Sequence, residues 1–218
     1  MPVPQATGGA PVVFDGQPVI RFRDESARRN FIKVAALVGA GSTLVAATRN
    51  DKKAFADATA NDLEILNYAL TLEYLEAEFY TRGVKGDALS GRALDLVTPI
   101  RDHEQEHVTV LTQVVKDLGG KPAAKPEFQF PAGTFTSKAK FLASASAFEE
   151  LGVTAYHGQV PRIDDADILK SAAAIAGVES RHAAIVADLM GGNPFPAPFE
   201  KTKSMKSVLK AAGPFIKS

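Results

Sequence analysis

The sequence predicts an all-α fold in which four helices pack as a bundle, and three observations support this prediction. From residue 61 onward, apolar residues recur at steps of three and four along four long segments, which is the period of an amphipathic helix. The alternation of polar and apolar residues that is typical of strands is nearly absent. Glycine and proline separate the four segments. The 218 residues, 45% of them hydrophobic, suffice for one modest domain with its own core.

The N-terminal residues 1–47 resemble a twin-arginine export signal. Arg28 and Arg29 precede an uncharged stretch, residues 34–47, that is shorter than the about 20 residues of a membrane-spanning helix. Small residues end this stretch and fit a cleavage site before Thr48. The alternatives are an amphipathic N-terminal helix and an uncleaved anchor. We expect an exported protein of the periplasm, the cell envelope or the extracellular space, in which residues 48–59 form a linker to the bundle at residues 60–191.

The first two segments predict helices over residues 61–82 and 92–118. We expect Gly83 and Gly86 to end the first helix, and Gly119 and Gly120 to end the second. Pro99 lies inside the second segment and should either kink its first turns or mark its true start.

The connection between the second and third helices is unusually long. Residues 121–136 contain Pro122, Pro126 and Pro131, so they cannot be helical and predict an extended crossover. Helices joined by short loops become antiparallel neighbours, whereas a long crossover can return along the bundle. We therefore expect the second and third helices to run parallel.

The third helix is expected to start with Thr136 or Ser137 as its N-cap and to continue to about His157, where Gly158 and Pro161 break it. The fourth follows the cap residues at positions 164–165 and ends before the glycines at positions 191–192. The Pro-rich tail, residues 192–218, is expected to pack on the bundle, with one short helix around residues 204–212.

Composition excludes several classes of function. The 25 basic side chains equal the 25 acidic ones, so no nucleic acid is expected as a partner, because phosphate binding needs an excess of Lys and Arg. The chain has no Cys, which rules out disulfides, thiolate nucleophiles, iron-sulfur clusters and Cys-built zinc sites. Any metal chemistry must use His and carboxylates.

Acidic residues interrupt each of the four apolar stripes at positions that the helical period assigns to the core. These residues are Glu73, Glu104 with His107, Glu149, and Glu179 with His182. Burial of one lone carboxylate would cost several kcal/mol or force its protonation, so four together need a common explanation. Residues i and i+3 share one helix face, so each Glu-x-x-His can aim an oxygen and a nitrogen at one point. Bundles that hold two metals use this pattern, with a further Glu from each of the other two helices.

An internal repeat supports two metal ions rather than surface glutamates that lie on the stripe by coincidence. Tyr80 follows Glu73 at the spacing at which Tyr156 follows Glu149, and each glutamate precedes a Glu-x-x-His by nearly the same distance. Four carboxylates and two neutral imidazoles would balance two divalent ions. Hard oxygen donors without a thiolate favour iron or manganese.

Several segments together resemble the ferritin-like superfamily, and more closely its exported members that are grouped with desiccation-related proteins. They are "NYALTLEYLEAEFY", "IRDHEQEHVTVL", "FEELGVTAYHG", "AAAIAGVESRHAAIV" and "PFIKS", within residues 60–215. The resemblance implies that Glu73 and His107 are terminal ligands of one metal, and Glu149 and His182 of the other, with Glu104 and Glu179 as bridges. It also implies that Tyr80 and Tyr156 hydrogen-bond a ligand carboxylate and serve the reaction, although both could simply fill the core.

Four neighbouring residues leave alternatives open. Glu76 replaces Glu73 if the first helix is rotated, and Glu150 is the corresponding alternative to Glu149. His103 either pairs with His107 or lies beside the stripe, and His157 is expected to be structural. Gly152 interrupts the third helix, where it either allows close helix contact or weakens the helix.

The sequence therefore favours an exported di-metal oxidoreductase of the ferroxidase, peroxidase or catalase-like kind, which protects the envelope from peroxide or dioxygen. The alternative is a non-enzymatic bundle, structural or stress-protective, or an accessory subunit of an envelope complex. Membrane or envelope association and a homo-oligomer are further expectations. Without Cys there is no fused rubredoxin-type donor, so reducing equivalents would come from the substrate or a partner.

Overall fold

A computed structural model describes the backbone of residues 49–217 and the side chains of residues 60–217. The predicted export signal at residues 1–47 lies outside this range. The described chain contains five α-helices and no strand, which confirms the all-α prediction. The helices are α2 (Arg49–Lys85), α3 (Gly91–Asp117), α4 (Lys138–Gln159), α5 (Ala166–Leu189) and α6 (Met205–Ala212). None of them combines the length and the hydropathy needed to cross a membrane.

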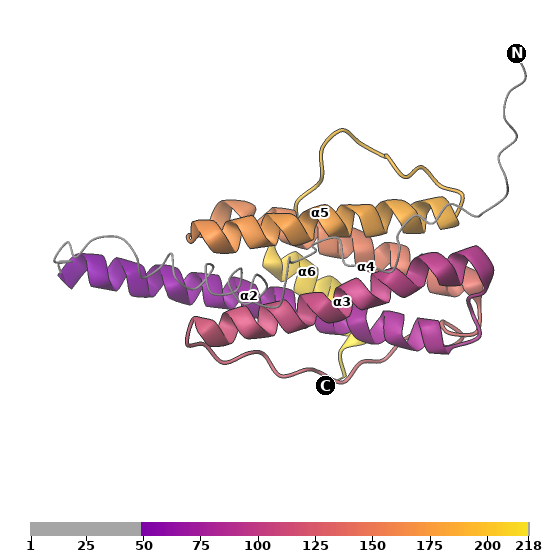
Figure 1. The fold of residues 1–218 in the computed structure, drawn as a ribbon, viewed down its shortest axis with the longest axis horizontal. Coiled ribbons are helices and arrows are strands. Elements are labelled where there is room, and N and C mark those ends of the chain that lie inside the picture. The colour runs from indigo at the N-terminus through magenta and orange to yellow at the C-terminus, as the bar shows by residue number, and fades with distance from the viewer. Residues whose placement is uncertain (1–48, 218) are drawn as a thin grey trace, which may run out of the picture.

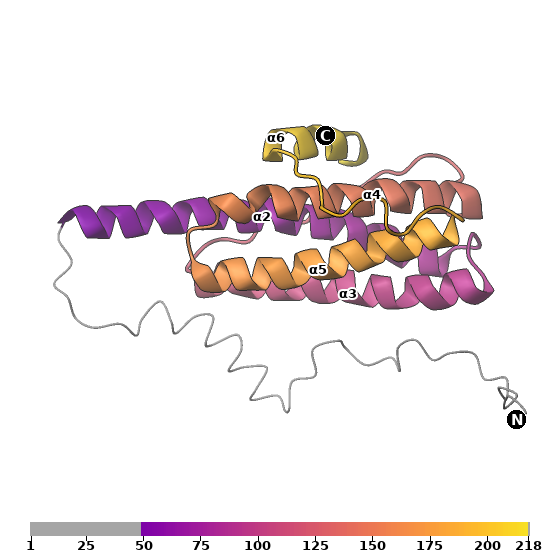
Figure 2. The same cartoon turned by 90° about the horizontal axis from the view of Figure 1, so that it is seen from above.

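Helices α2 to α5 lie side by side and form the bundle (Figures 1 and 2). Helix α2 packs mainly against α3, and α4 packs mainly against α5, so the bundle consists of two helix pairs. The colour order in Figure 1 shows that α3 and α4 run in the same direction, as the long crossover predicts. Each pair therefore forms one half of the internal repeat.

Helix α2 is longer at both ends than the sequence predicts. It begins at Arg49, within the stretch 48–59 that we expect to be a linker, and its N-terminal part projects beyond the other helices (Figure 2). No glycine or proline lies between Arg49 and Gly83, and alanine and charged residues favour helix there. Gly83 does not end the helix either. A Cβ at Gly83 would overlap the ring of Phe141, so this glycine serves helix packing.

The third predicted helix also continues past its expected end. Helix α4 runs to Gln159 and includes Gly158, and Pro161 follows in a 3-10 turn, Val160–Arg162. A Cβ at Gly158 would overlap the backbone carbonyl of Lys203, whose N–H donates to the Thr154 carbonyl at 3.0 Å. Gly158 therefore allows the tail to approach α4 and does not break the helix.

The other helix ends lie close to their expected places. Helix α3 runs from Gly91 to Asp117, and Gly119, which has φ +76°, follows directly after the C-cap residue Leu118. Pro99 therefore lies inside the helix and does not mark its start. Ser137 caps α4. Asp165 caps α5, because its carboxylate accepts from the N–H groups of the first turn at 2.8 and 3.0 Å.

The crossover and the tail lie on the outside of the bundle. Phe128 of the crossover forms an isolated antiparallel bridge with Ile216 of the tail. Helix α6 packs on α4 (Figure 2), and its Val208 is buried in the larger hydrophobic cluster. That cluster is built around aromatic residues such as Phe79, and a smaller one includes Leu66. On each bundle helix, the predicted metal ligands fall between residues of the two clusters.

Candidate metal centre

The structure brings all six predicted ligands together in the interior of the bundle. The four glutamates are 0% exposed, His107 is 8% exposed and His182 is 4% exposed. Every bundle helix contributes: α2 supplies Glu73, α3 supplies Glu104 and His107, α4 supplies Glu149, and α5 supplies Glu179 and His182. The helical period places these side chains inward in all four helices, as the apolar stripes predict.

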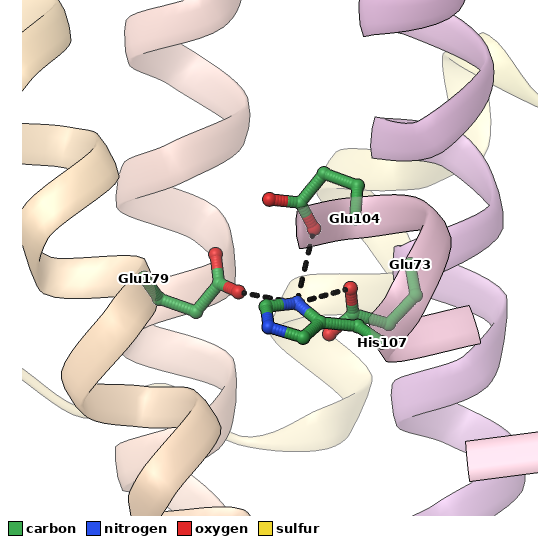
Figure 3. Close-up of side chains that lie close together, drawn as sticks. All are labelled: Glu73, Glu104, His107 and Glu179. Atoms are coloured by element: carbon green, nitrogen blue, oxygen red, sulfur yellow. Dashed lines mark hydrogen bonds and ion pairs between the residues drawn. The ribbon is translucent and has the colours of Figure 1, made fainter. Parts of the chain in front are cut away.

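Three carboxylates surround the imidazole of His107 (Figure 3). Its Nδ1 lies 3.1 Å from Glu73 Oε2, 3.3 Å from Glu104 Oε2 and 3.2 Å from Glu179 Oε1. One ligand atom from each of these four residues lies within 4.8 Å of the others. This spacing suits a single cation bound by one nitrogen and three oxygens.

A second group of donors surrounds His182. Its Nδ1 lies 2.8 Å from Glu104 Oε1, 3.6 Å from Glu149 Oε2 and 3.9 Å from Glu179 Oε2. Ligand atoms of Glu104, Glu149 and His182 also lie within 4.8 Å of one another. A second cation therefore has its own nitrogen and its own terminal carboxylate.

Glu104 and Glu179 belong to both groups of donors. Each presents one carboxylate oxygen to His107 and the other oxygen to His182. A carboxylate in this position can bridge two ions, whereas Glu73 and Glu149 each face only one imidazole. The division into terminal and bridging ligands that the resemblance implies stays a prediction, with which this placement of the carboxylates is compatible.

Five buried polar atoms of this centre form no well-aligned hydrogen bond among the described residues, although His182 Nδ1 and Glu104 Oε1 lie 2.8 Å apart. They are Glu104 Oε1, Glu149 Oε2, both carboxylate oxygens of Glu179, and His182 Nδ1. A buried carboxylate oxygen without a partner costs about 1–3 kcal/mol or more, because it has lost its water. Divalent cations would satisfy all five atoms at once, so the donor set fits metal ions.

Electrostatics lead to the same conclusion. Burial raises the pKa of Glu73 and of Glu149 well above the usual value, and neighbouring carboxylates raise it further. Burial also acts on Glu104, but the attraction of His107 and His182 outweighs it and holds the Glu104 pKa below its usual range. Burial alone would lower the pKa of His107, yet Glu73 and Glu104 raise it well above normal. The centre therefore needs protons or cations to balance its negative charge.

The two predicted tyrosines connect the halves of the repeat crosswise. Tyr80 of α2 donates to Glu149 Oε1 of α4, and Tyr156 of α4 donates to Glu73 Oε1 of α2. Burial raises the pKa of both tyrosines well above the usual value, so both hydroxyls remain donors. Each tyrosine therefore orients the terminal glutamate of the opposite helix pair.

A fifth acidic residue, Glu76, lies beside the six predicted ligands. It is 3% exposed, and one of its oxygens lies within 4.8 Å of oxygens of Glu149 and Glu179. The sequence poses Glu76 as an alternative to Glu73, but the structure buries both. A Cβ at Gly152 would lie 3.1 Å from Glu76 Oε1 and 3.3 Å from Glu179 Oε2, so Gly152 leaves room for these carboxylates.

The remaining alternatives are resolved by the structure. His103 pairs with His182, not with His107: its Nδ1 lies 2.9 Å from His182 Nε2, and the two rings stack at 5.2 Å. Because Nε2 of His182 contacts His103, its Nδ1 is free to face the carboxylates. Glu150 is exposed and does not compete with Glu149. The Nδ1 of His157 lies 2.9 Å from the Val153 carbonyl, which is a structural contact.

Comparisons with known proteins are consistent with this centre. A family model described as "Ferritin-like domain" matches residues 61–192, which include α2 from residue 61 onward and the whole of α3, α4 and α5. A comparison with curated proteins finds no significant match. The family match covers more than half of the chain and the whole of the metal centre, so the chain belongs to the family of ferritin-like domains.

Proposed function

We propose that this chain binds two divalent metal ions, iron or manganese, in the centre of the bundle and uses them to react with peroxide or dioxygen. The observation that supports the proposal is the set of buried carboxylate oxygens that face two imidazoles without well-aligned hydrogen bonds. Six oxygen and nitrogen ligands without a thiolate suit iron or manganese better than copper or zinc.

The residues have separate tasks in this proposal. Glu73 and His107 would hold one ion, Glu149 and His182 the other, and the remaining two glutamates would bridge them. Two adjacent metal ions supply the redox chemistry, because they can change oxidation state together. The chain's own contribution is to orient the terminal glutamates through the two tyrosines and to exclude bulk water with the hydrophobic clusters on both sides.

We further propose that the protein acts outside the cytoplasm as a protein of the periplasm, the envelope or the extracellular space, where it removes oxidants. This part of the proposal is supported by Arg28 and Arg29 before an uncharged stretch, and by the resemblance to exported, desiccation-related relatives. Reducing equivalents would come from the substrate or from a partner, and the assembly would be a homo-oligomer or part of an envelope complex.

A structural role is the second candidate, and Glu76 favours it. This carboxylate lies beside Glu149 and Glu179, so it can fill a coordination position that a reactive centre would leave open. In that role the metals would hold the four helices together without turnover. Metal removal would then lower the melting temperature sharply while peroxide loss stays at the background rate.

Metal analysis of the full chain, combined with a peroxide assay, separates the two candidates. We expect about two equivalents of iron or manganese per chain, and peroxide loss that disappears in Glu104→Ala. The matched control is Glu150→Ala, because Glu150 is exposed on the helix that supplies Glu149. Bound metal without peroxide loss would support the structural role, and turnover by a metal-free protein would contradict both candidates.

A further inference from the structure

A third histidine, His103, lies beside the metal centre without belonging to its six predicted ligands. Its Nδ1 lies 2.9 Å from Nε2 of His182, and the two rings stack with their centroids 5.2 Å apart and their planes inclined by 14°. His103 lies on α3 and His182 on α5, so the contact joins the two helix pairs of the bundle. Because His182 is only 4% exposed, its ring depends on protein atoms for its hydrogen bonds.

The contact leaves the other ring nitrogen of His182 available to a cation. An imidazole that binds a cation through Nδ1 carries its hydrogen on Nε2, where it can only donate. The atom beside Nε2 must then accept, and the Nδ1 of a neutral His103 does so when the hydrogen of His103 is on its own Nε2. The two histidines therefore form a complete hydrogen bond in the form of His182 that a metal ligand requires.

Two contacts favour the same orientation of the His182 ring. Nδ1 faces Glu104 Oε1 at 2.8 Å and Glu149 Oε2 at 3.6 Å, while Nε2 faces His103. If the ring turned over about its bond to the side chain, carbon atoms would take the places of both nitrogens. The contact with His103 therefore keeps Nδ1 directed at the carboxylates even when they hold no proton and no cation.

The two halves of the repeat differ at this position. Glu104 and Glu179 correspond to each other in the repeat, and the residue before each is His103 in one half and Val178 in the other. A valine side chain has no atom that can accept a hydrogen bond. Among the described residues, the polar contacts of the His107 ring are made by its Nδ1. The described part of the chain thus supplies an outer partner to His182 but not to His107.

We propose that His103 is a positioning residue for the metal position beside His182: it accepts the Nε2 hydrogen of His182 and holds Nδ1 toward Glu104 and Glu149. Outer partners of this kind change the metal affinity of a site by about 10–100-fold, because they fix the tautomer and the orientation of the ligand. The inference rests on the proposed metal binding. It adds a residue outside the six ligands that acts on one of the two positions.

Two substitutions separate the hydrogen bond from the packing of the ring. His103→Phe keeps a flat ring that can stack on His182 but removes the acceptor, whereas His103→Asn loses the ring and keeps an acceptor oxygen near the place of Nδ1. Titration of the full chain with manganese(II), followed by the electron paramagnetic resonance of the free ion, measures both binding steps. We expect His103→Phe to bind one ion about 10–100-fold more weakly and the other with little change, and His103→Asn to remain within about threefold of the wild type.

The position that is lost can be identified directly. Anomalous scattering from crystals of His103→Phe grown at limiting manganese should show lower occupancy beside His182 than in the wild type, and unchanged occupancy beside His107. His157→Phe is the matched control, because His157 also lies outside the six ligands and its Nδ1 contacts the Val153 carbonyl of its own helix. This control should change neither binding step, and thermal unfolding of each variant checks the fold.

Nitrogen-15 NMR tests the hydrogen bond itself. The chain has four histidines, so their ring nitrogens can be assigned in the full chain loaded with zinc(II), which is diamagnetic. We expect the hydrogen of His182 on Nε2 and that of His103 on its own Nε2, with Nδ1 of His103 as the acceptor. A hydrogen on Nδ1 of His103 in the loaded protein would overturn the proposal.

The binding data can overturn it in three further ways: unchanged affinity in His103→Phe, equal loss at both positions, or the same loss in His103→Asn as in His103→Phe. If the wild type bound no manganese, the proposed function would fail together with this inference. A normally loaded wild type beside an unchanged His103→Phe variant would contradict this inference alone.

Discussion

Replacement of Tyr156 by phenylalanine should weaken the metal position beside His107 more than the position beside His182. Tyr156 donates to Glu73 Oε1, and the other oxygen of Glu73 lies 3.1 Å from His107 Nδ1. Without the hydroxyl, Glu73 loses the contact that holds its carboxylate in one orientation. Tyr80→Phe should have the reciprocal effect, because Tyr80 holds the glutamate on the His182 side.

The size of the effect follows from the burial of these groups. Loss of a hydrogen bond that orients a metal ligand costs about 10–100-fold in affinity, or about 1.4–2.8 kcal/mol. In the metal-free protein, the same substitution leaves Glu73 Oε1 buried without its donor, at about 1–3 kcal/mol. For a chain of this size, that corresponds to a melting temperature about 2–12 °C lower.

Anomalous scattering from crystals grown at limiting manganese measures the occupancy of each position separately. In Tyr156→Phe, the position beside His107 should have the lower occupancy of the two. In Tyr80→Phe, the position beside His182 should have the lower occupancy. Tyr74→Phe serves as the control, because among the described residues the hydrogen bonds from tyrosine to the six predicted ligands come from Tyr80 and Tyr156 and not from Tyr74. Equal loss at both positions in each variant, or no loss at all, would refute the crosswise coupling.

Three further predictions follow from the same structure. Gly152→Ala places a methyl group against two carboxylates, so isothermal titration should show about tenfold weaker metal binding, although the added helix propensity stabilises the metal-free fold by about 0.5–1 kcal/mol. Gly83→Ala forces the buried ring of Phe141 to move, and thermal unfolding should reveal a loss of about 1–3 kcal/mol. Burial raises the pKa of Glu73, and nearby carboxylates raise that of His107 despite its burial, so the folded metal-free protein keeps protons that the unfolded chain loses. Its melting temperature in the presence of a chelator should therefore fall between about pH 6.5 and 8, while metal affinity rises; a rising melting temperature would show that the sign is wrong.

The sequence was sufficient to predict the bundle because its signals are periodic and repeated. Glu104 and His107 lie on one helix face by spacing alone, and the same pattern recurs at Glu179 and His182. A buried carboxylate is so costly that four of them on apolar stripes indicate a shared cation. The long crossover predicted that the second and third helices run parallel, because a connection of that length can return along the bundle, whereas a short loop cannot.

Features that depend on contacts between helices could not be predicted in this way. Gly83 and Gly158 are typical of helix ends, but both lie inside helices, where the ring of Phe141 and the backbone of Lys203 occupy the space of the missing side chain. The stacking of His103 on His182 joins α3 to α5, so no spacing within one helix indicates it. The crosswise tyrosines and the second acidic residue on α2 likewise depend on how the helices are rotated against one another.

The most direct test of the account is to count and locate the metal ions in the full chain. Crystals of protein loaded with manganese or iron, measured at the absorption edge of the metal, should show two anomalous peaks about 3.5–4 Å apart. One peak should lie beside His107 Nδ1 and the other beside His182 Nδ1, with Glu104 and Glu179 in contact with both. A loaded protein with no metal between these side chains, or with ions bound only at its surface, would contradict the central claim.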